Sequence, residues 1–167
     1  TASIARSVDD CGDVVIIPSF TGIGAPYWRS DIKGAIFGLH RGTNRNHLIR
    51  AALESIAFQV NDLVAAVNDH LSTPVSSMLV DGGAVKNDFL MQFQSDILNI
   101  SVKRPKQIES TALGAGYLAG LGLGFWSSVN ELKKNKKIET VFKSEMSSLT
   151  RKLNLQKWKN AIDTLLR

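Results

Sequence analysis

The strongest constraint on the fold is a short apolar run that passes through two glycines into an amphipathic segment. Met78 to Val80 form the run, and Asp81-Gly82-Gly83 interrupts it. Beyond the glycines, apolar residues recur every three or four positions, at Phe89, Leu90, Phe93, Ile97 and Leu98. This change of period predicts a strand, a tight turn and then a helix with Asp96 on its wetter face.

The turn itself has the layout of a nucleotide-binding loop. Two glycines at the carboxyl end of a strand tolerate positive φ and let a ligand approach the backbone closely. Asn87 stands near the start of the predicted helix, where it can cap backbone N–H groups or reach a bound purine. The residues alone favour the simpler interpretation, a tight turn followed by a cap, and leave the ligand-binding one open.

Strands and helices alternate along the rest of the chain, which predicts an α/β domain. We expect further strands at 14–17, 34–39 and 100–103, and helices at 47–70, capped by Asn44 or Asn46, and at 112–121. Glycines within the 112–121 helix suggest close packing against another element. A lysine-rich connector then leads to a final helix, whose apolar face we expect to contain Leu149, Leu153, Trp158, Ile162, Leu165 and Leu166.

The charge distribution argues against binding to nucleic acids. The net charge of the 167-residue chain is +5, but residues 131–167 hold ten Lys/Arg and four Asp/Glu (+6), and the other 130 residues are at −1. No aromatic residues are interleaved with the lysines at 133–137, so a solvated helix end is favoured. No apolar stretch is long enough to span a bilayer. The lone Cys11 cannot form an internal disulfide, and we therefore expect a cytoplasmic protein.

Few residues present a recognisable catalytic pattern. His40, His47 and His70 are scattered, so no metal site is expected in this chain. Neither a G-x-S-x-G elbow nor a Gly-Lys-Ser/Thr phosphate loop occurs. Asp81 and Glu54 are the only acids in distinctive contexts. We interpret Asp81 as a brace for the turn through backbone hydrogen bonds, and Glu54 as structural.

Three segments closely resemble the C-terminal half of the FGGY carbohydrate kinases. They are 18–42, its continuation at 46–59, and 81–99 together with 109–126. The first two fit a family signature through Gly34, Ile36, Gly38, Leu39, His47, Leu48, Ala51, Ala52, Leu53 and Glu54. The residues APYW and DGGA are similar to those of members that phosphorylate glycerol rather than xylulose, gluconate or ribulose. The resemblance fades after Trp126.

The resemblance implies an actin-like ATPase (ribonuclease H-like) fold with two domains and ATP in the cleft between them. Residues 1–167 would be most of the second domain, with a core at about 12–127 and a basic helical tail at about 128–167. Gly83 and Asn87 match the family residues that contact adenosine, and Gly82 and Ala84 belong to the same cofactor-binding motif. The family often has Ala at the position of Lys86, for which we expect a solvent-facing side chain.

The implied reaction transfers the γ-phosphoryl group of ATP to glycerol, giving glycerol 3-phosphate and ADP with Mg²⁺. The family's catalytic base, glycerol contacts and phosphate-binding turns precede the part seen here, so no catalytic residue is assigned. The resemblance also implies that the full-length protein forms a dimer or tetramer. Two alternatives remain open: a kinase for another polyol or sugar, and a non-catalytic nucleotide-binding or dimerisation module.

Overall fold

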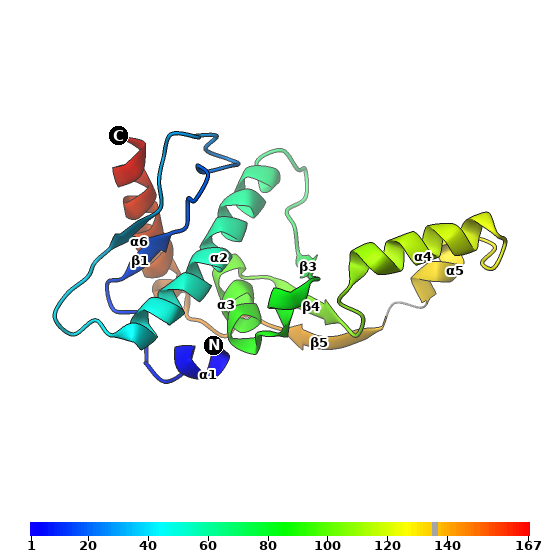
Figure 1. Cartoon of the computed structure of the whole chain (residues 1–167), viewed down its shortest axis with the longest axis horizontal. Coiled ribbons are helices and arrows are strands. Elements are labelled where there is room, and N and C mark those ends of the chain that lie inside the picture. Colours follow the sequence, from blue (N-terminus) through cyan, green and yellow to red (C-terminus); the bar gives the residue numbers. More distant parts are fainter. Residues whose placement is uncertain (135–136) are drawn as a thin grey trace.

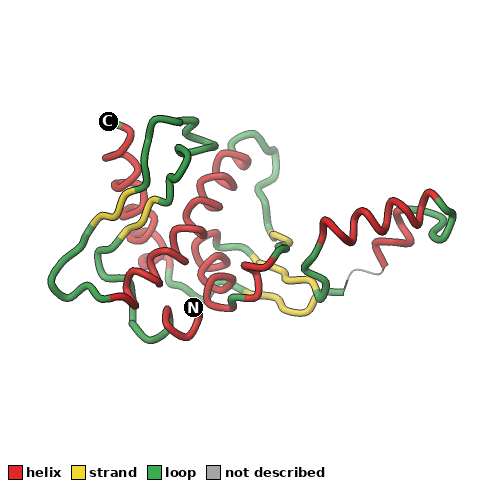
Figure 2. Tube along the Cα trace, viewed as in Figure 1, coloured by secondary structure: helices red, strands yellow, loops and turns green. Residues whose placement is uncertain are grey.

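Two central helices lie between two small sheets (Figures 1 and 2). The computed structural model describes residues 1–134 and 137–167. The central helices are α2 (Arg45–Asn68) and α3 (Asp88–Leu98). On one side, β1 (Val15–Ile17) and β2 (Ala35–Phe37) pair antiparallel. On the other, β3 (Ser77–Leu79), β4 (Ser101–Pro105) and β5 (Ile138–Phe142) form a sheet in that order. The α/β alternation predicted from the sequence is therefore present.

The three-stranded sheet combines both pairing directions. β3 runs parallel to β4, with Met78 opposite Val102, and β5 runs antiparallel to β4, with Phe142 opposite Val102. The sequence placed β5 within a lysine-rich connector, and this was wrong. β5 is an edge strand whose Ile138 and Val141 remain exposed, so only Phe142 reaches the core.

The hydrophobic core extends past the expected boundary near residue 127. α6 (Ser148–Leu166) contributes Trp158 and Ile162 to the same buried cluster as Leu90 and Ile97 of α3. The expected helical tail therefore packs into the body. Its apolar face was only partly predicted, because Leu149 and Leu153 are more than half exposed.

Two polar side chains hold the starts of helices. The sequence left the cap of α2 open between Asn44 and Asn46, and it placed Asp96 on the wrong face. Asn44, not Asn46, caps α2, because its Oδ1 accepts from the backbone N–H groups of Asn46 at 2.9 Å and His47 at 3.3 Å. Asp96 is buried and not on a wet face. Its Oδ1 accepts from the backbone N–H groups of Glu145 at 2.7 Å and Met146 at 3.2 Å, and so holds the entry to α6.

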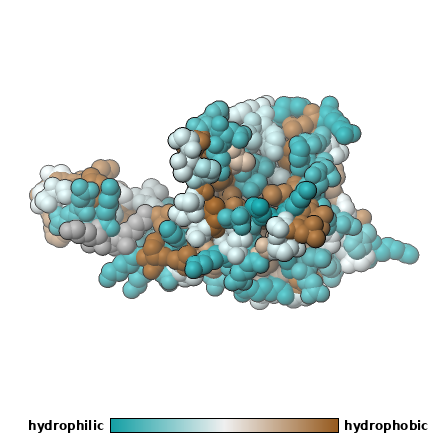
Figure 3. All heavy atoms as spheres, turned by 180° about the vertical axis from the view of Figure 1, so that it is seen from behind, coloured by the Kyte–Doolittle hydropathy of each residue, from teal (hydrophilic) through white to brown (hydrophobic). Residues whose placement is uncertain are grey.

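Two helices form an arm that extends away from the body (Figure 1). They are α4 (Ser110–Gly122) and α5 (Val129–Lys134), and the chain opens with a short helix, α1 (Ala2–Ala5). No residue of α4 is buried, and hydrophobic residues are visible on the surface of both arm and body (Figure 3). A Cβ at Gly120 would lie 2.2 Å from Trp126, whereas Gly114 and Gly116 face nothing within 4 Å. Close packing thus explains only Gly120 of these glycines.

Among the described residues, none of the helices combines the length and apolar character needed to cross a membrane.

Candidate functional site

The Asp81-Gly82-Gly83 turn is held from behind by the chain that leaves β4. The N–H of Val80 donates to the carbonyl of Lys103 at 3.1 Å and extends the β3–β4 pairing by one residue. The N–H of Gly82 donates to the carbonyl of Ile108 at 2.7 Å. Gly82 has φ of +84°, a conformation that favours glycine. The Asp81 carboxylate accepts from the Ser110 hydroxyl, so Asp81 braces the turn through a side-chain contact.

A short 3₁₀ helix, η1 (Gly83–Lys86), separates the turn from α3, where the sequence predicted a direct passage into the helix. Asn87 lies between the two helices and caps α3, its Oδ1 accepting from the N–H of Leu90 at 3.2 Å. Its Nδ2 donates to the hydroxyl of Thr1 at 3.2 Å, and both residues line a hollow. The cap that the sequence suggested is therefore present, and Nδ2 carries a second N–H group besides the one donated to Thr1.

This hollow brings three of the four predicted site residues together. Its volume is about 430 Å³, and it is lined by Thr1, Ala2, Leu53, Ile56, Gly83, Ala84, Lys86, Asn87 and Leu90. Gly82 does not line it and forms the backbone bend that precedes η1. Leu53 and Ile56 form an apolar wall from α2. Sequence reasoning missed that wall, in which Ile56 remains 40% exposed.

Gly83 is not required by the internal packing of the chain. A Cβ at this position would meet nothing within 4 Å. Gly22 is a useful contrast, because its φ is +98° and a Cβ there would lie 2.6 Å from the Cα of Ser30. The loop itself therefore needs glycine at 22, whereas at 83 the open space lies within the hollow. A flat ligand could approach the backbone of Gly83 without meeting a side chain.

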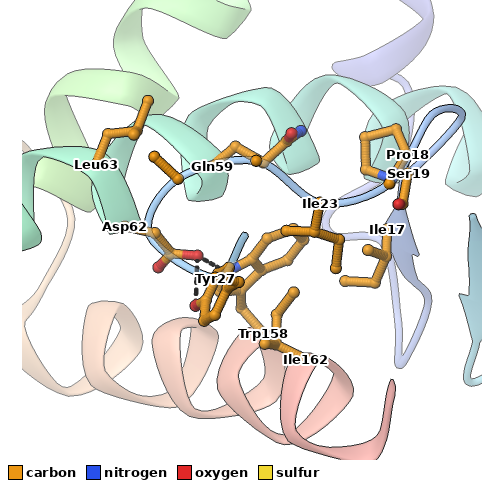
Figure 4. A pocket seen from close by; sticks show the side chains of 13 residues that line it. Ile17, Pro18, Ser19, Ile23, Tyr27, Gln59, Asp62, Leu63, Trp158 and Ile162 are labelled. Atoms are coloured by element: carbon orange, nitrogen blue, oxygen red, sulfur yellow. Dashed lines mark hydrogen bonds between the residues drawn. The ribbon is translucent and has the colours of Figure 1, made fainter. Parts of the chain in front are cut away.

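Two other hollows contain none of the four predicted site residues. One of about 350 Å³ lies between α2, α6 and the loop after β1 (Figure 4). Its polar groups bind each other, because Tyr27 and Trp158 both donate to the Asp62 carboxylate. A larger one, about 730 Å³, lies between the sheet and the arm. Its lining includes Asp81 of the turn and Tyr117 of α4. It is open along the exposed helix α4.

A buried polar cluster on α2 is structural. Arg50 Nε donates to Glu54 Oε1 at 2.8 Å, and Arg50 Nη1 also donates to the carbonyl of Val8 at 2.6 Å. Burial raises the pKa of Glu54, and the hydrogen bond from Arg50 partly opposes this rise. The Cys11 thiol donates to Glu54 Oε2 at 3.2 Å. These groups satisfy one another, as expected for Glu54. Within residues 1–134 and 137–167, no group of three or more His, Cys, Asp or Glu side chains is arranged to hold a metal ion.

Solved structures that resemble this chain belong to one class of kinases. The glycerol kinase of Plasmodium falciparum with ADP superposes with a TM-score of 0.88 at 36% identity, over 99% of this chain and 33% of that one. A xylulose kinase from Lactobacillus acidophilus gives a TM-score of 0.83 at 23% identity, over 98% of this chain and 34% of its own. The fold is thus that of one domain of an actin-like ATPase, as the sequence predicted.

The sequence comparisons name the family. Residues 2–123 match the C-terminal domain of the FGGY family of carbohydrate kinases. The chain belongs to this family. It is 51% identical to a glycerol kinase of Desulfitobacterium hafniense and 50% identical to one of Shewanella halifaxensis, in each case over 97% of this chain. The chain spans about a third of the length of these relatives, with 33% of each covered.

Proposed function

We propose that the chain is the nucleotide-binding part of a kinase that transfers the γ-phosphoryl group of ATP to glycerol. The observation that carries the proposal is the hollow in which Gly83, Ala84 and Asn87 face an apolar wall on α2. Identities near 50% to glycerol kinases, and the similarity to a glycerol kinase structure with ADP, support the choice of nucleotide and substrate.

The residues of the hollow suit an adenosine group. Leu53 and Ile56 offer apolar side chains against which a purine can pack, and Gly83 presents bare backbone. The Nδ2 of Asn87 has two N–H groups, of which one donates to Thr1 and the other can donate to a base or ribose, while its Oδ1 remains on α3. Lys86 is exposed at the rim and carries the positive charge among the lining residues, which suits an anionic nucleotide. We therefore assign binding to Gly83, Ala84 and Asn87, and the preceding bend to Gly82.

The chain contributes binding and orientation, not proton transfer. No described residue beside the hollow is placed to act as a base toward an alcohol, and we assign that step to the part of the longer relatives that this chain does not match. We expect Mg²⁺ to be held mainly through phosphate oxygens, as is usual for this ion. From the family resemblance we also infer a cytoplasmic location and, for the full-length protein, assembly into a dimer or tetramer. Light scattering after size-exclusion chromatography of the full-length protein would measure this assembly.

Calorimetric titration of the chain with ADP tests the proposal. Gly83→Leu fills the hollow, and Gly116→Leu is the matched control, because a Cβ at either glycine meets nothing within 4 Å. We expect Gly83→Leu to weaken ADP binding at least tenfold, roughly the loss of 1.4 kcal/mol or more, and Gly116→Leu to leave it unchanged. Equal ADP affinity in the two variants would refute the site.

Turnover separates the proposed kinase from its alternatives. We expect the chain alone to bind ADP without phosphorylating glycerol in a coupled ADP-release assay, and kinase-level turnover by the chain alone would contradict this assignment. Activity of the polypeptide that also contains the catalytic domain, tested on a panel of polyols and sugars, distinguishes glycerol from other substrates. ADP binding without turnover in that polypeptide would favour a non-catalytic nucleotide-binding module.

A further inference from the structure

Arg104 on β4 contacts both sides of the segment that lines the hollow. Its side chain is only 13% exposed. Nη1 donates to the carbonyl of Val85 at 2.9 Å and to the carboxylate of Asp88 at 2.6 Å. Val85 lies two residues before Asn87, within η1, and Asp88 is the first residue of α3. One guanidinium thus holds the end of η1 and the start of α3 together.

The remaining contacts of Arg104 fix it to the sheet. Nε donates to the carboxylate of Glu139 at 3.0 Å, and Nη2 donates to the hydroxyl of Thr140 at 3.2 Å. The guanidinium carbon lies 5.4 Å from the centre of the Phe142 ring. All three partners belong to β5, the edge strand. The planar fork of arginine can make these contacts and those to the turn at once, which the single ammonium of lysine cannot do.

We propose that Arg104 is the positioning residue of the nucleotide site, an inference that rests on the proposed function. Arg104 does not line the hollow, so it acts through the backbone that it holds. With Val85 and Asp88 both fixed to one group, the Asn87 side chain is held in the orientation from which it meets the hollow. Because these hydrogen bonds lie within the chain itself, nucleotide binding does not have to order the turn.

A residue that positions the turn and a residue that attracts phosphate have different effects on ADP and adenosine binding. A cation that attracts phosphate weakens ADP binding when it is removed but leaves binding of uncharged adenosine unchanged. A positioning residue affects both ligands by the same factor, because the base and ribose contacts depend on the turn. Arg104 is already paired with Asp88 and Glu139, so its charge is largely neutralised locally.

The test measures dissociation constants of ADP and adenosine by calorimetry for the chain and its Arg104→Met and Arg104→Lys variants. Methionine keeps much of the apolar stem, so the packing on Phe142 is partly preserved. We expect Arg104→Met to weaken both ligands by the same factor, about tenfold, the order expected for one charge-assisted hydrogen bond. Arg104→Lys restores the charge but not the fork, so we expect most of the loss to remain.

Two controls keep the result interpretable. Arg29→Met removes another arginine of an ion pair, since Arg29 Nη2 lies 2.7 Å from Asp31 Oδ2, outside the hollow, and we expect no change in either dissociation constant. Asp88→Asn keeps an acceptor oxygen but removes the charge of one partner at a half-exposed position, and we expect a smaller weakening, again equal for the two ligands.

Wild-type affinity in Arg104→Met, or a loss confined to ADP, would overturn the positioning role. If the wild-type chain binds neither ADP nor adenosine, the proposed function itself is wrong, and the positioning role fails with it. Binding by the wild type that is insensitive to Arg104 leaves the proposed function intact and removes only this inference.

Discussion

The carboxylate of Asp62 joins three parts of the body that are far apart in sequence. Its Oδ2 accepts from the Tyr27 hydroxyl at 2.9 Å and from the indole N–H of Trp158 at 2.7 Å (Figure 4). Tyr27 belongs to the loop between β1 and β2, Asp62 to α2 and Trp158 to α6. The indole is 2% exposed and stacks on Phe58 at 5.2 Å between ring centres. Asp62→Ala should therefore loosen both the loop and the last helix.

The expected loss is large for a single side chain. A hydrogen bond to a charged acceptor contributes about 1.5–3 kcal/mol. Because Asp62 is only partly buried, we discount the sum of its two bonds to about 2–4 kcal/mol for Asp62→Ala, against a typical domain stability of about 5–15 kcal/mol. Asp62→Asn keeps an acceptor oxygen of the same shape and should cost about 1–2 kcal/mol.

The asparagine variant also has a predictable pH dependence. Burial raises the pKa of Asp62 above its usual 3.8, against the opposing effect of the hydrogen bonds from Trp158 and Tyr27. The folded state thus favours the protonated form. The part of the stability that depends on this titration is complete below pH 3.8 and lost as the pH rises through the folded pKa, whereas the hydrogen bonds to the ionised carboxylate remain. Since asparagine does not titrate, the cost of Asp62→Asn should shrink as the pH rises through this window.

Urea unfolding followed by far-ultraviolet circular dichroism measures these free energies of unfolding. Asp13→Ala is the matched control, because the Asp13 carboxylate also pairs with α6, through Lys157 at 3.2 Å, but is 78% exposed. A surface pair of this kind contributes about 0–1 kcal/mol. If Asp62→Ala costs no more than Asp13→Ala, the carboxylate does not hold the loop and α6 as inferred.

Three further predictions concern the arm, the rim of the hollow and the thiol. Gly116→Ala should stabilise the chain by about 1 kcal/mol through helix propensity. Gly120→Ala should destabilise it, because a Cβ would lie 2.2 Å from Trp126. Thermal unfolding compares the two variants, and a loss of stability in both would mean that the Gly116 side of α4 is not open. Lys86→Ala should weaken ADP binding and leave adenosine binding unchanged in calorimetry, whereas the Arg104 variants should weaken both. Equal effects of Lys86→Ala on the two ligands would contradict a purely electrostatic role. Burial, and to a smaller extent the negative charge of Glu54, raise the pKa of Cys11 from 9.0 to about 12. Its alkylation at pH 8 should therefore be on the order of a thousandfold slower than that of an ordinary thiol. A normal alkylation rate in the folded chain would show that the thiol is not held on Glu54.

Hydrophobic period was sufficient to predict most elements. β1 to β4 and helices α2, α3, α4 and α6 fall where apolar runs or helical spacing indicated them, with ends shifted by a few residues. β5 was missed because its exposed Ile138 and Val141 give no alternation that stands out beside the flanking lysines. The burial of Asp96 was missed for another reason, since its partners are backbone N–H groups of Glu145 and Met146, almost fifty residues away.

The candidate site could be predicted only as far as its own turn. Gly83 and Asn87 are close in sequence, and glycine and asparagine are residues whose local chemistry is recognisable. The wall formed by Leu53 and Ile56 depends on how α2 packs against α3, which no local pattern specifies. Arg104 lies just beyond the strand predicted at 100–103 and carries no local signal, because its role depends on a carbonyl and two carboxylates that only the folded chain brings together.

Hydrogen bonds to β4 and to the chain that follows it hold the turn on one side, and its other side faces the hollow. The N–H of Gly82 binds the carbonyl of Ile108, and the carbonyl of Val85 binds Arg104, so β4 and the residues that follow it hold both ends of the turn. Gly83, between them, faces the hollow with nothing within 4 Å of its Cβ position. A binding surface that is fixed before the ligand arrives loses little conformational entropy on binding. Gly83 is therefore held by its neighbours on both sides and open toward the hollow where we propose that the nucleotide binds.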